Sequence, residues 1–461
     1  MSRRKPPVCL HQEITLTLTG QSHTGDGVGK YEGFAVFVPG GIAGETVRAK
    51  VTKVKPTYAH ARIVRILKES PDRVTPPCPI FDRCGGCQLQ HLAYDGQLKM
   101  KTRLVRDNLE RIGQLKEVSV RPVMGMRDPW RYRNKAQVPF GEGEGGLVAG
   151  FYEQGTHDII DMESCLIQRE ESDEVVRTVK DIVRELGIPP YREKDHTGVL
   201  RHVVTKVGAN TGQLMIVLVT NGPDLPHRDE LVKRFVDRFP QLQSVIQNVN
   251  SKRTNVIMGE DSRTLWGEDT IIDTIGDIAF AISPRSFYQV NPEQTEVLYR
   301  EVLKAADLKG GETVVDAYCG IGTISLFLAR HARRVLGVEV VDEAIADAKR
   351  NARLNGIENV HFAVGKAEDV MPWWYAQGVR PDVIVVDPPR KGCDERLLDT
   401  IADMKPERTV YVSCNPSTLA RDLRILADHG FTVEYVQPVD MFPHTVHVEC
   451  CVLLEKNRRY V

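Results

Sequence analysis

From about residue 279 onward, the chain alternates regularly between short apolar runs and segments with helical spacing. Strands are expected at Thr313–Ala317, Arg334–Val338, Val360–Val364, Val383–Val386, Thr409–Ser413, Thr432–Val436 and His447–Leu454. Alternation of strand and helix predicts an α/β fold, a parallel sheet with helices on both faces. Because ligands bind outside the carboxyl ends of the strands in such sheets, the residues that end each strand are the first candidates for a site.

Residues 1–70 predict a separate structure. Short strands separated by glycine-rich turns such as Gly25–Gly29 are expected at Glu13–Thr19, Phe34–Val38, Glu45–Val54 and Ala59–Ile66. Their even spacing predicts a small antiparallel barrel of the oligonucleotide-binding type. The segment holds eleven Lys and Arg against five Asp and Glu, a net charge of +6 in a chain whose overall charge is -1. A basic module of this kind is typical of a polyanion-binding appendage, and an ordinary solvated basic face has the same composition.

A chain of 461 residues is too long for one core, so we expect three domains, at 1–70, 71–278 and 279–461. The middle domain mixes strands and helices, with paired strands at Leu200–Val207 and Leu214–Thr220. Its first helix, about 94–115, has four apolar residues on one face and is expected to pack on the C-terminal domain. These residues are Leu98, Val105, Leu109 and Ile112. Basic residues of this helix are expected away from that face: Lys99, Lys101, Arg103, Arg106 and Arg111.

No apolar run approaches the length of a membrane span, and the basic start has no apolar stretch of a secretory signal behind it. We therefore expect a cytoplasmic protein that binds no membrane and needs no obligate protein partner. Ten cysteines in such a chain argue against a disulfide framework. Three of them, Cys78, Cys84 and Cys87, fall within ten residues, and this clustering predicts a metal ion or a cluster.

The first two strands of the alternating region predict a nucleoside site. The first runs into a turn containing Gly320 and Gly322, and the second ends at Glu339, about twenty residues beyond the glycines. Glycines allow close approach of the backbone to a ligand, and the carboxylate can accept hydrogen bonds from ribose hydroxyls. Because the third glycine of a dinucleotide motif is missing, the pattern fits S-adenosylmethionine better than NAD. The turn alone is a weak signal, since a plain strand-turn-helix has the same glycines.

Two further strand ends carry candidates for chemistry. The fourth strand ends in Asp387-Pro-Pro-Arg390, and the prolines predict a rigid loop. Methyltransferases that act on amino groups have an aromatic residue where Arg390 stands, which argues against an exocyclic amine as the target. The fifth strand ends at Cys414, ahead of a helix expected from about Ser417, and a thiol near a helix N-terminus tends to have a lowered pKa.

Cys414 at this edge would explain methylation of a pyrimidine ring carbon. A thiolate that adds to carbon 6 of uracil turns carbon 5 into a nucleophile toward a methyl donor. A base must then remove the proton from carbon 5, and Glu449 is the candidate if the last strand is antiparallel to the others. The plain alternatives are a buried structural cysteine, as expected for Cys319, Cys393, Cys450 and Cys451, and a surface glutamate at a strand start.

These motifs resemble those of the bacterial 23S ribosomal RNA (uracil-5-)-methyltransferases, and the resemblance covers nearly the whole chain. Within that family the chain is most similar to the single-gene type that modifies two uridines. The matching motifs are Ser283–Asn291, Asp316–Gly320, Asp387–Gly392 and Ser413–Pro416. The resemblance implies that Cys414 is the nucleophile and Glu449 the base. It implies that the methyl donor or its target is contacted by Gln289, Tyr318, Glu339 and Asp387. Thr323 stands where some relatives have asparagine.

The resemblance extends to the first half of the chain. Residues 13–68 are similar to the RNA-binding barrel called TRAM, and Cys78, Cys84, Cys87 and Cys165 are similar to four ligands of a [4Fe-4S] cluster. Four thiolates suit such a cluster, and from spacing alone zinc is a rival. The implied partner is 23S ribosomal RNA. The alternatives are methylation of transfer RNA, whose relative in this family lacks the barrel and the cysteines, an iron–sulfur radical enzyme, and a non-catalytic RNA-binding protein.

Overall fold

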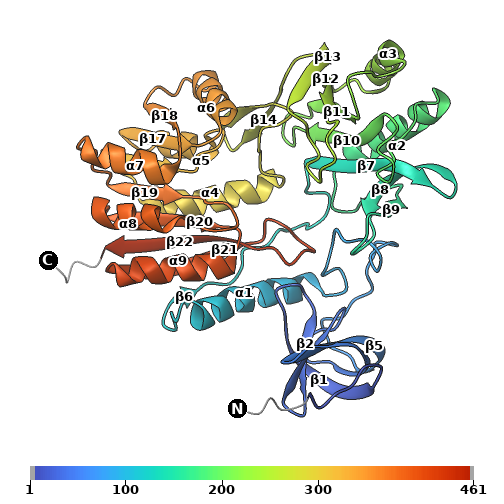
Figure 1. Cartoon of the computed structure of the whole chain (residues 1–461). Coiled ribbons are helices and arrows are strands. Elements are labelled where there is room, and N and C mark those ends of the chain that lie inside the picture. The colour runs from blue at the N-terminus through green and yellow to red at the C-terminus, as the bar shows by residue number, and fades with distance from the viewer. Residues whose placement is uncertain (1–5, 457–461) are drawn as a thin grey trace.

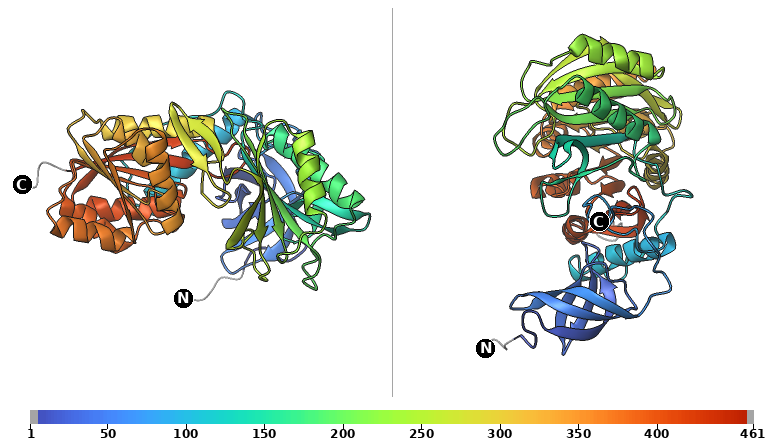
Figure 2. Two further views of the ribbon diagram at one scale, coloured as in Figure 1. Left: turned by 90° about the horizontal axis from the view of Figure 1, so that it is seen from above. Right: turned by 90° about the vertical axis from the view of Figure 1, so that its right-hand side faces the viewer.

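The structure is a computed structural model that describes residues 6–456. It has an N-terminal barrel, a long helix beside it, a central seven-stranded sheet and a C-terminal eight-stranded sheet (Figure 1). Viewed from above, the C-terminal sheet and its helices lie to one side of the central sheet (Figure 2), and the barrel lies far below the central sheet (Figure 1). No helix within residues 6–456 combines the length and the apolar character needed to cross a membrane.

The barrel is closed and has the strand order β1-β2-β3-β5-β4. Its strands are β1 (Glu13–Gln21), β2 (Gly27–Tyr31), β3 (Phe34–Val38), β4 (Thr46–Val54) and β5 (Tyr58–Lys68). Buried and exposed residues alternate along β1, as expected for a strand with one face on the core. The expected barrel is confirmed, but the prediction that it is antiparallel throughout is wrong, because β3 and β5 pair in parallel.

Strand β2 was not predicted, since its glycines indicate a turn. Both Gly27 and Gly29 instead lie in the strand, where β1 crosses closely. A Cβ atom on Gly29 would lie 2.6 Å from the carbonyl oxygen of Thr17, and one on Gly27 would lie 2.6 Å from Leu18. Glycine at these two positions therefore allows two strands to approach each other closely. A tight turn also selects glycine, so the sequence does not distinguish the two structures.

Helix α1 (Tyr94–Arg111) agrees with the predicted helix, and Val105 and Leu109 lie in the core as expected. Two details of the prediction are wrong. Ile112 is exposed, and Lys101, which was placed away from the apolar face, is fully buried. The reason is a partner far away in sequence: the Lys101 ammonium forms an ion pair with Asp440 at 2.5 Å.

The central sheet has the order β13-β12-β11-β10-β7-β8-β9 and mixes parallel and antiparallel pairs. Its strands are β7 (Lys135–Gly143), β8 (Gly146–Tyr152), β9 (Ile159–Asp161), β10 (Leu200–Val207), β11 (Leu214–Thr220), β12 (Leu242–Val249) and β13 (Asp261–Gly267). Helices α2 (Glu170–Glu185) and α3 (Arg228–Arg238) pack on one face. Residues of the other face share a core with the hairpin β14 (Ile271–Ile275) and β15 (Ile278–Ile282) and with the C-terminal domain.

The C-terminal sheet has the order β18-β17-β16-β19-β20-β22-β21-β6. Its strands are β16 (Thr313–Ala317), β17 (Arg334–Glu339), β18 (Val360–Val364), β19 (Val383–Val386), β20 (Arg408–Ser413), β21 (Phe431–Val439), β22 (Glu449–Lys456) and the short β6 (Ser119–Val120). All neighbours are parallel except that β22 runs antiparallel to both β20 and β21. The predicted parallel sheet is thus confirmed, and the last strand has the antiparallel direction on which the choice of Glu449 depended.

Helices cover both faces of this sheet. One face carries α4 (Pro292–Ala306), α5 (Thr323–Ala329) and α6 (Asp342–Leu354). The other carries α7 (Ala367–Ala376), α8 (Glu395–Met404), α9 (Pro416–Asp428) and also α1, which contributes Val105 and Leu109 to the same core. The carboxyl ends of the parallel strands are left open to the central domain.

Candidate active site

A cavity of about 1100 Å³ lies at the carboxyl ends of the C-terminal strands. The six residues that the sequence proposed for cofactor and catalysis all line it: Gln289, Tyr318, Glu339, Asp387, Cys414 and Glu449. They come from separate loops and strand ends, which meet because parallel strands end at one edge. The central domain contributes Glu260 and Ser262 to the wall.

Glu339 organises the part of the cavity next to β16 and β17. Its carboxylate accepts hydrogen bonds from the backbone N–H groups of Gly320 at 3.3 Å, Val340 at 2.8 Å and Val341 at 3.0 Å. Tyr318 has a φ of +67°, and this left-handed turn directs the glycine loop back over the strand ends. The arrangement gives a carboxylate beside the exposed apolar side chains of Val340 and Val341, which suits a ribose and an adenine ring.

Thr323 lies at the start of α5, and its hydroxyl accepts a hydrogen bond from the Tyr299 hydroxyl at 2.9 Å. It is not among the cavity-lining residues of the described chain, so its bond is to the core. Gln289 reaches the cavity from the loop before α4. That loop is held by Lys206 of the central sheet, whose ammonium donates to the carbonyls of Ser283 at 2.7 Å and Ser286 at 3.0 Å.

The loop after β19 brings Asp387 and Arg390 to the cavity. The Arg390 carbonyl accepts hydrogen bonds from the side chains of Asn415 at 2.9 Å and Thr418 at 3.2 Å, so this loop is tied to the start of α9. Burial raises the pKa of Asp387 to about 6. Arg390 is exposed and lines the cavity. The loop thus offers a weakly acidic carboxyl and a guanidinium to a ligand.

Cys414 occupies the step between β20 and α9, and the Asn415 side chain caps the helix by accepting from the Ser417 N–H at 3.1 Å. The predicted lowering of its pKa is wrong: the pKa of the thiol is raised to about 11. Burial is the main cause, and the carboxyl groups of Glu449 and Asp387 add to it, while Arg390 opposes them. These effects outweigh the helix terminus because the thiol is half-buried among carboxylates.

Glu449 is the first residue of β22, and the antiparallel register pairs Ser413 with Cys450. The side chain of Glu449 therefore lies beside Cys414 at the cavity, and it is 5% exposed. Burial raises the pKa of Glu449 well above its usual value, and Asp387 adds to the rise. A buried carboxyl whose pKa is raised in this way suits a group that exchanges a proton with a bound ligand.

The cysteines of the second predicted site also come close together, because Cys165, which is distant in sequence, lies near Cys87. Cys78, Cys84, Cys87 and Cys165 are free and half-buried. Burial and the neighbouring thiols raise the pKa of Cys87 to about 12, and burial raises that of Cys165 to about 11. The Gly86 N–H donates to the Cys84 sulfur at 3.4 Å. Within residues 6–456, no three His, Cys, Asp or Glu side chains lie as a group that could hold one metal ion.

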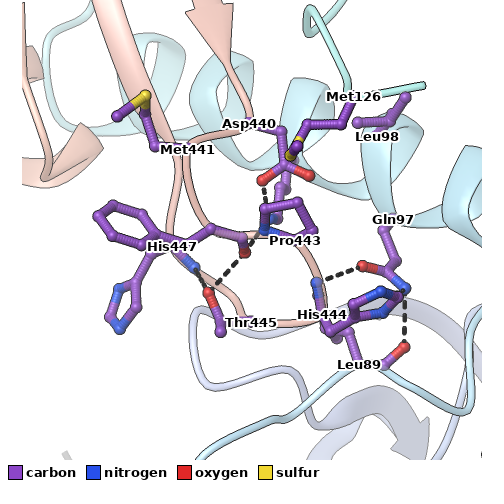
Figure 3. A network of polar contacts seen from close by, with 12 residues as sticks. Leu89, Gln97, Leu98, Met126, Asp440, Met441, Pro443, His444, Thr445 and His447 are labelled. Carbon is purple, nitrogen blue, oxygen red and sulfur yellow. Dashed lines mark hydrogen bonds and ion pairs between the residues drawn. The ribbon is translucent and has the colours of Figure 1, made fainter. Parts of the chain in front are cut away.

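A group of residues that the sequence interpretation missed lies behind Glu449. Lys101 of α1 forms an ion pair with Asp440 in the loop between β21 and β22. Gln97 of the same helix accepts a hydrogen bond from the backbone N–H of His444 in that loop (Figure 3). The helical spacing indicated that Lys101 lies on the apolar face, since it precedes Val105 by four residues and Leu109 by eight. The partner residues, more than 300 positions away, gave none.

Two parts of the chain, the C-terminal domain and the barrel, each match a known protein family. The family model described as tRNA (uracil-5-)-methyltransferase matches residues 272–457, which contain the cavity's main walls. The family model for the TRAM domain matches residues 7–64, the barrel.

Whole-chain relatives are similarly described. The chain is 61% identical over 455 residues to an uncharacterized RNA methyltransferase of Halalkalibacterium halodurans, covering 99% of each chain. It is 53% identical over 447 residues to one of Listeria monocytogenes, covering 97% of this chain and 98% of the relative. Its structure is similar to a crystal structure of Pyrococcus abyssi tRNA (uracil-54, C5)-methyltransferase in complex with S-adenosyl-L-homocysteine. That match has 30% identity and a TM-score of 0.76 and covers 96% of this chain and 100% of the other.

Proposed function

The chain belongs to the RNA (uracil-5-)-methyltransferase family and uses S-adenosylmethionine to methylate carbon 5 of uridine in RNA; from this premise we propose that its substrate is 23S ribosomal RNA and that Cys414 and Glu449 carry out the reaction. The observation that supports these roles most is the meeting of a thiol and a buried carboxyl on one cavity wall.

In the first step, the Cys414 sulfur, as thiolate, adds to carbon 6 of the uracil. The electrons of the C5–C6 double bond move into an enolate, which makes carbon 5 nucleophilic. S-adenosylmethionine, when bound, supplies an electrophilic methyl group. The donor and the uracil would be held by Gln289, Tyr318, Glu339 and Asp387. Carbon 5 would form its bond to the methyl group as the bond between that group and the donor's sulfur breaks, and the demethylated donor would leave. The target uridine enters the cavity splayed out of its stack.

In the second step, the Glu449 carboxylate takes the proton from carbon 5. The electrons of that C–H bond restore the C5–C6 double bond, the C6–sulfur bond breaks, and Cys414 leaves as thiolate. The raised pKa of Glu449 makes its ionised form a stronger base than an exposed glutamate. Arg390, which acts on both groups, stabilises their ionised forms by its charge.

The choice of RNA has two candidates. The barrel and the exposed basic residues of α1 support an RNA gripped through its backbone, and 23S ribosomal RNA is the candidate that the resemblance of the sequence motifs favours. Transfer RNA is the second candidate, because the Pyrococcus abyssi enzyme acts on tRNA and matches 96% of this chain. That match also corrects the sequence interpretation, in which the barrel argued against tRNA: a barrel of this kind accompanies a tRNA enzyme as well.

We further infer that Cys78, Cys84, Cys87 and Cys165 hold a [4Fe-4S] cluster. The donor set is four free thiols, and Cys78, Cys84 and Cys165 all lie close enough to Cys87 to raise the pKa of its thiol. A four-iron cluster binds each thiolate through a different iron atom, so its four thiolates lie farther apart than the four around one zinc ion. No step of the methyl transfer requires this group, and its role is to fix the segments that contain the cysteines.

One experiment tests the substrate and the residues together. The protein is incubated with labelled methyl donor and with 23S ribosomal RNA or transfer RNA from cells that lack the enzyme, and the nucleosides are analysed. We expect 5-methyluridine in 23S RNA with the natural chain and none with Cys414→Ala. For Glu449→Gln we expect a covalent protein–RNA adduct in a denaturing gel. Label in tRNA alone would overturn the substrate, and normal turnover by Cys414→Ala would overturn the mechanism.

A further inference from the structure

The loop between β21 and β22, residues 440–448, contacts α1, the segment around Leu89 and the barrel, and Figure 3 shows the contacts with Gln97 and Leu89. From the barrel, Gly25 lies so close that a Cβ atom there would be 3.0 Å from Val446. From the cysteine segment, the backbone N–H groups of Gln88 and Leu89 both donate to the His444 carbonyl at 3.0 Å. The loop ends at Glu449, so these contacts bear on the candidate base.

A buried ion pair fixes the start of the loop. The Lys101 ammonium lies 2.5 Å from the Asp440 carboxylate and donates to the Phe442 carbonyl at 3.0 Å. Both charged side chains have no exposed surface. The Tyr94 hydroxyl donates to the other Asp440 oxygen at 2.9 Å. A pair so enclosed and so fully bonded holds one geometry.

His444, in the middle of the loop, is held through its backbone and one side of its ring, while its buried Nε2 has no hydrogen-bond partner among the described residues. Its N–H donates to the Gln97 side-chain oxygen at 2.9 Å, and its ring stacks on Trp130 with centroids 3.7 Å apart. The Gln97 amide donates to the carbonyls of Leu89 at 3.1 Å and Leu92 at 2.8 Å, so this buried side chain joins α1, the cysteine segment and the loop. His444 has a φ of +66°, a left-handed conformation that a non-glycine residue adopts only where its surroundings enforce it.

The position of this loop determines where its cavity-lining residues lie. Phe442 and His447 line the cavity on either side of the held segment, and Glu449 follows two residues later. The Thr445 hydroxyl donates to the Phe442 carbonyl at 2.8 Å and accepts from the His447 N–H at 3.3 Å, which closes the loop on itself. A loop fixed in this way moves as one unit, so a change at α1 shifts the groups that face the substrate.

We propose that Gln97 and Lys101 are positioning residues for the removal of the carbon 5 proton, a role that rests on the proposed function of Glu449. When they hold the loop, the Glu449 carboxylate lies in line to take that proton as the C6–sulfur bond to Cys414 breaks. When they do not, the earlier steps proceed and elimination slows, because proton transfer depends steeply on the distance between carboxylate and proton.

The test uses the full-length variants Gln97→Leu and Lys101→Met in steady-state methylation of 23S RNA. We expect turnover to fall at least about tenfold, the KM for S-adenosylmethionine to stay unchanged, and a methylated protein–RNA adduct to accumulate in denaturing gels. The double variant Lys101→Met/Asp440→Leu, which leaves no unpaired buried charge, is expected to trap the adduct as well and covers failure of the single variant to fold. Matched controls are the exposed residues in Gln377→Leu and Lys349→Met.

Glu449→Gln is run beside them to separate the two possible failures. If Glu449→Gln traps the adduct and the Gln97 and Lys101 variants lose turnover without trapping it, their role is structural and the proposal is wrong. If turnover by these variants equals that of the controls, the proposal is also wrong. If Glu449→Gln traps no protein–RNA adduct, the assignment of Glu449 as the base is wrong, and the positioning role is wrong with it.

Discussion

Ser413 and Cys450 face each other across the antiparallel pair β20–β22, so the next residues outward, Cys414 and Glu449, meet at the cavity. This pairing depends on the direction of the last strand. In an entirely parallel sheet the amino end of β22, and with it Glu449, would lie at the opposite edge. The thiol and the carboxyl are therefore neighbours because the final strand is inserted in reverse between β20 and β21.

The first prediction concerns the ionisation of Cys414. With a pKa of about 11, the thiol is mostly protonated at neutral pH. Since only the thiolate reacts, alkylation of Cys414 by iodoacetamide should rise about tenfold per pH unit from about pH 7 to 9 without levelling off. Peptide mapping by mass spectrometry at each pH measures this rate separately from the other cysteines.

Variants of the neighbours give the sign of each influence. Glu449→Gln removes a negative charge that raises the thiol pKa, so alkylation at pH 8 should become faster. Arg390→Leu removes a positive charge that lowers it, so alkylation should become slower. A rate that levels off near pH 8.5 in the natural chain, as for an ordinary thiol, would contradict the elevated pKa.

The second prediction concerns Glu339 and the methyl donor. Its carboxylate holds three backbone N–H groups of the cavity wall and is placed to accept from ribose hydroxyls. Because hydrogen bonds to a charged group contribute about 1.5–3 kcal/mol each, Glu339→Ala should weaken binding of S-adenosylmethionine about 100-fold. Isothermal titration measures the affinity, with Cys414→Ala as a control that binds normally. Equal affinity in Glu339→Ala would remove this residue from the donor site.

The strands of the C-terminal domain could be predicted closely because each is a buried apolar run ended by a polar residue. Three of them, β16, β18 and β19, have the bounds expected from sequence. The same reasoning brought Glu339, Asp387 and Cys414 to one edge, since strand direction alone decides where a parallel strand ends.

What could not be predicted depends on partners distant in sequence. Lys101 looked like a solvated charge because Asp440 lies 339 residues away. The pKa of Cys414 was misjudged because a helix terminus is visible in sequence, whereas burial and the carboxyl groups of Glu449 and Asp387 are not. Strand β2 was missed because close packing of strands and a tight turn select the same residue, glycine.

The third prediction concerns the cysteine cluster. Protein purified without oxygen should contain about four iron and four sulfide ions per chain, and Cys87→Ser should lose them. Cys9→Ser, at an exposed cysteine of the N-terminal segment, is the matched control and should keep them. Metal and sulfide analysis gives the result directly. If the analysis finds one zinc ion per chain and no sulfide, the four cysteines hold zinc and the proposed iron–sulfur cluster is wrong.

The fourth prediction concerns the glycines of the barrel. A Cβ atom on Gly29 would meet the backbone oxygen of Thr17 at 2.6 Å and Leu16 at 2.9 Å, whereas one on Gly20 would meet nothing within 4 Å. Gly29→Ala should therefore lower the free energy of unfolding by about 1–3 kcal/mol, because β1 and β2 must move apart. Gly20→Ala should leave it within about 0.5 kcal/mol of the natural value or raise it slightly, since alanine restricts the unfolded chain. Denaturant unfolding monitored by hydrogen exchange in the barrel compares the two. If Gly29→Ala is as stable as Gly20→Ala, the strand contact is looser than 2.6 Å implies, and the glycine is there for another reason.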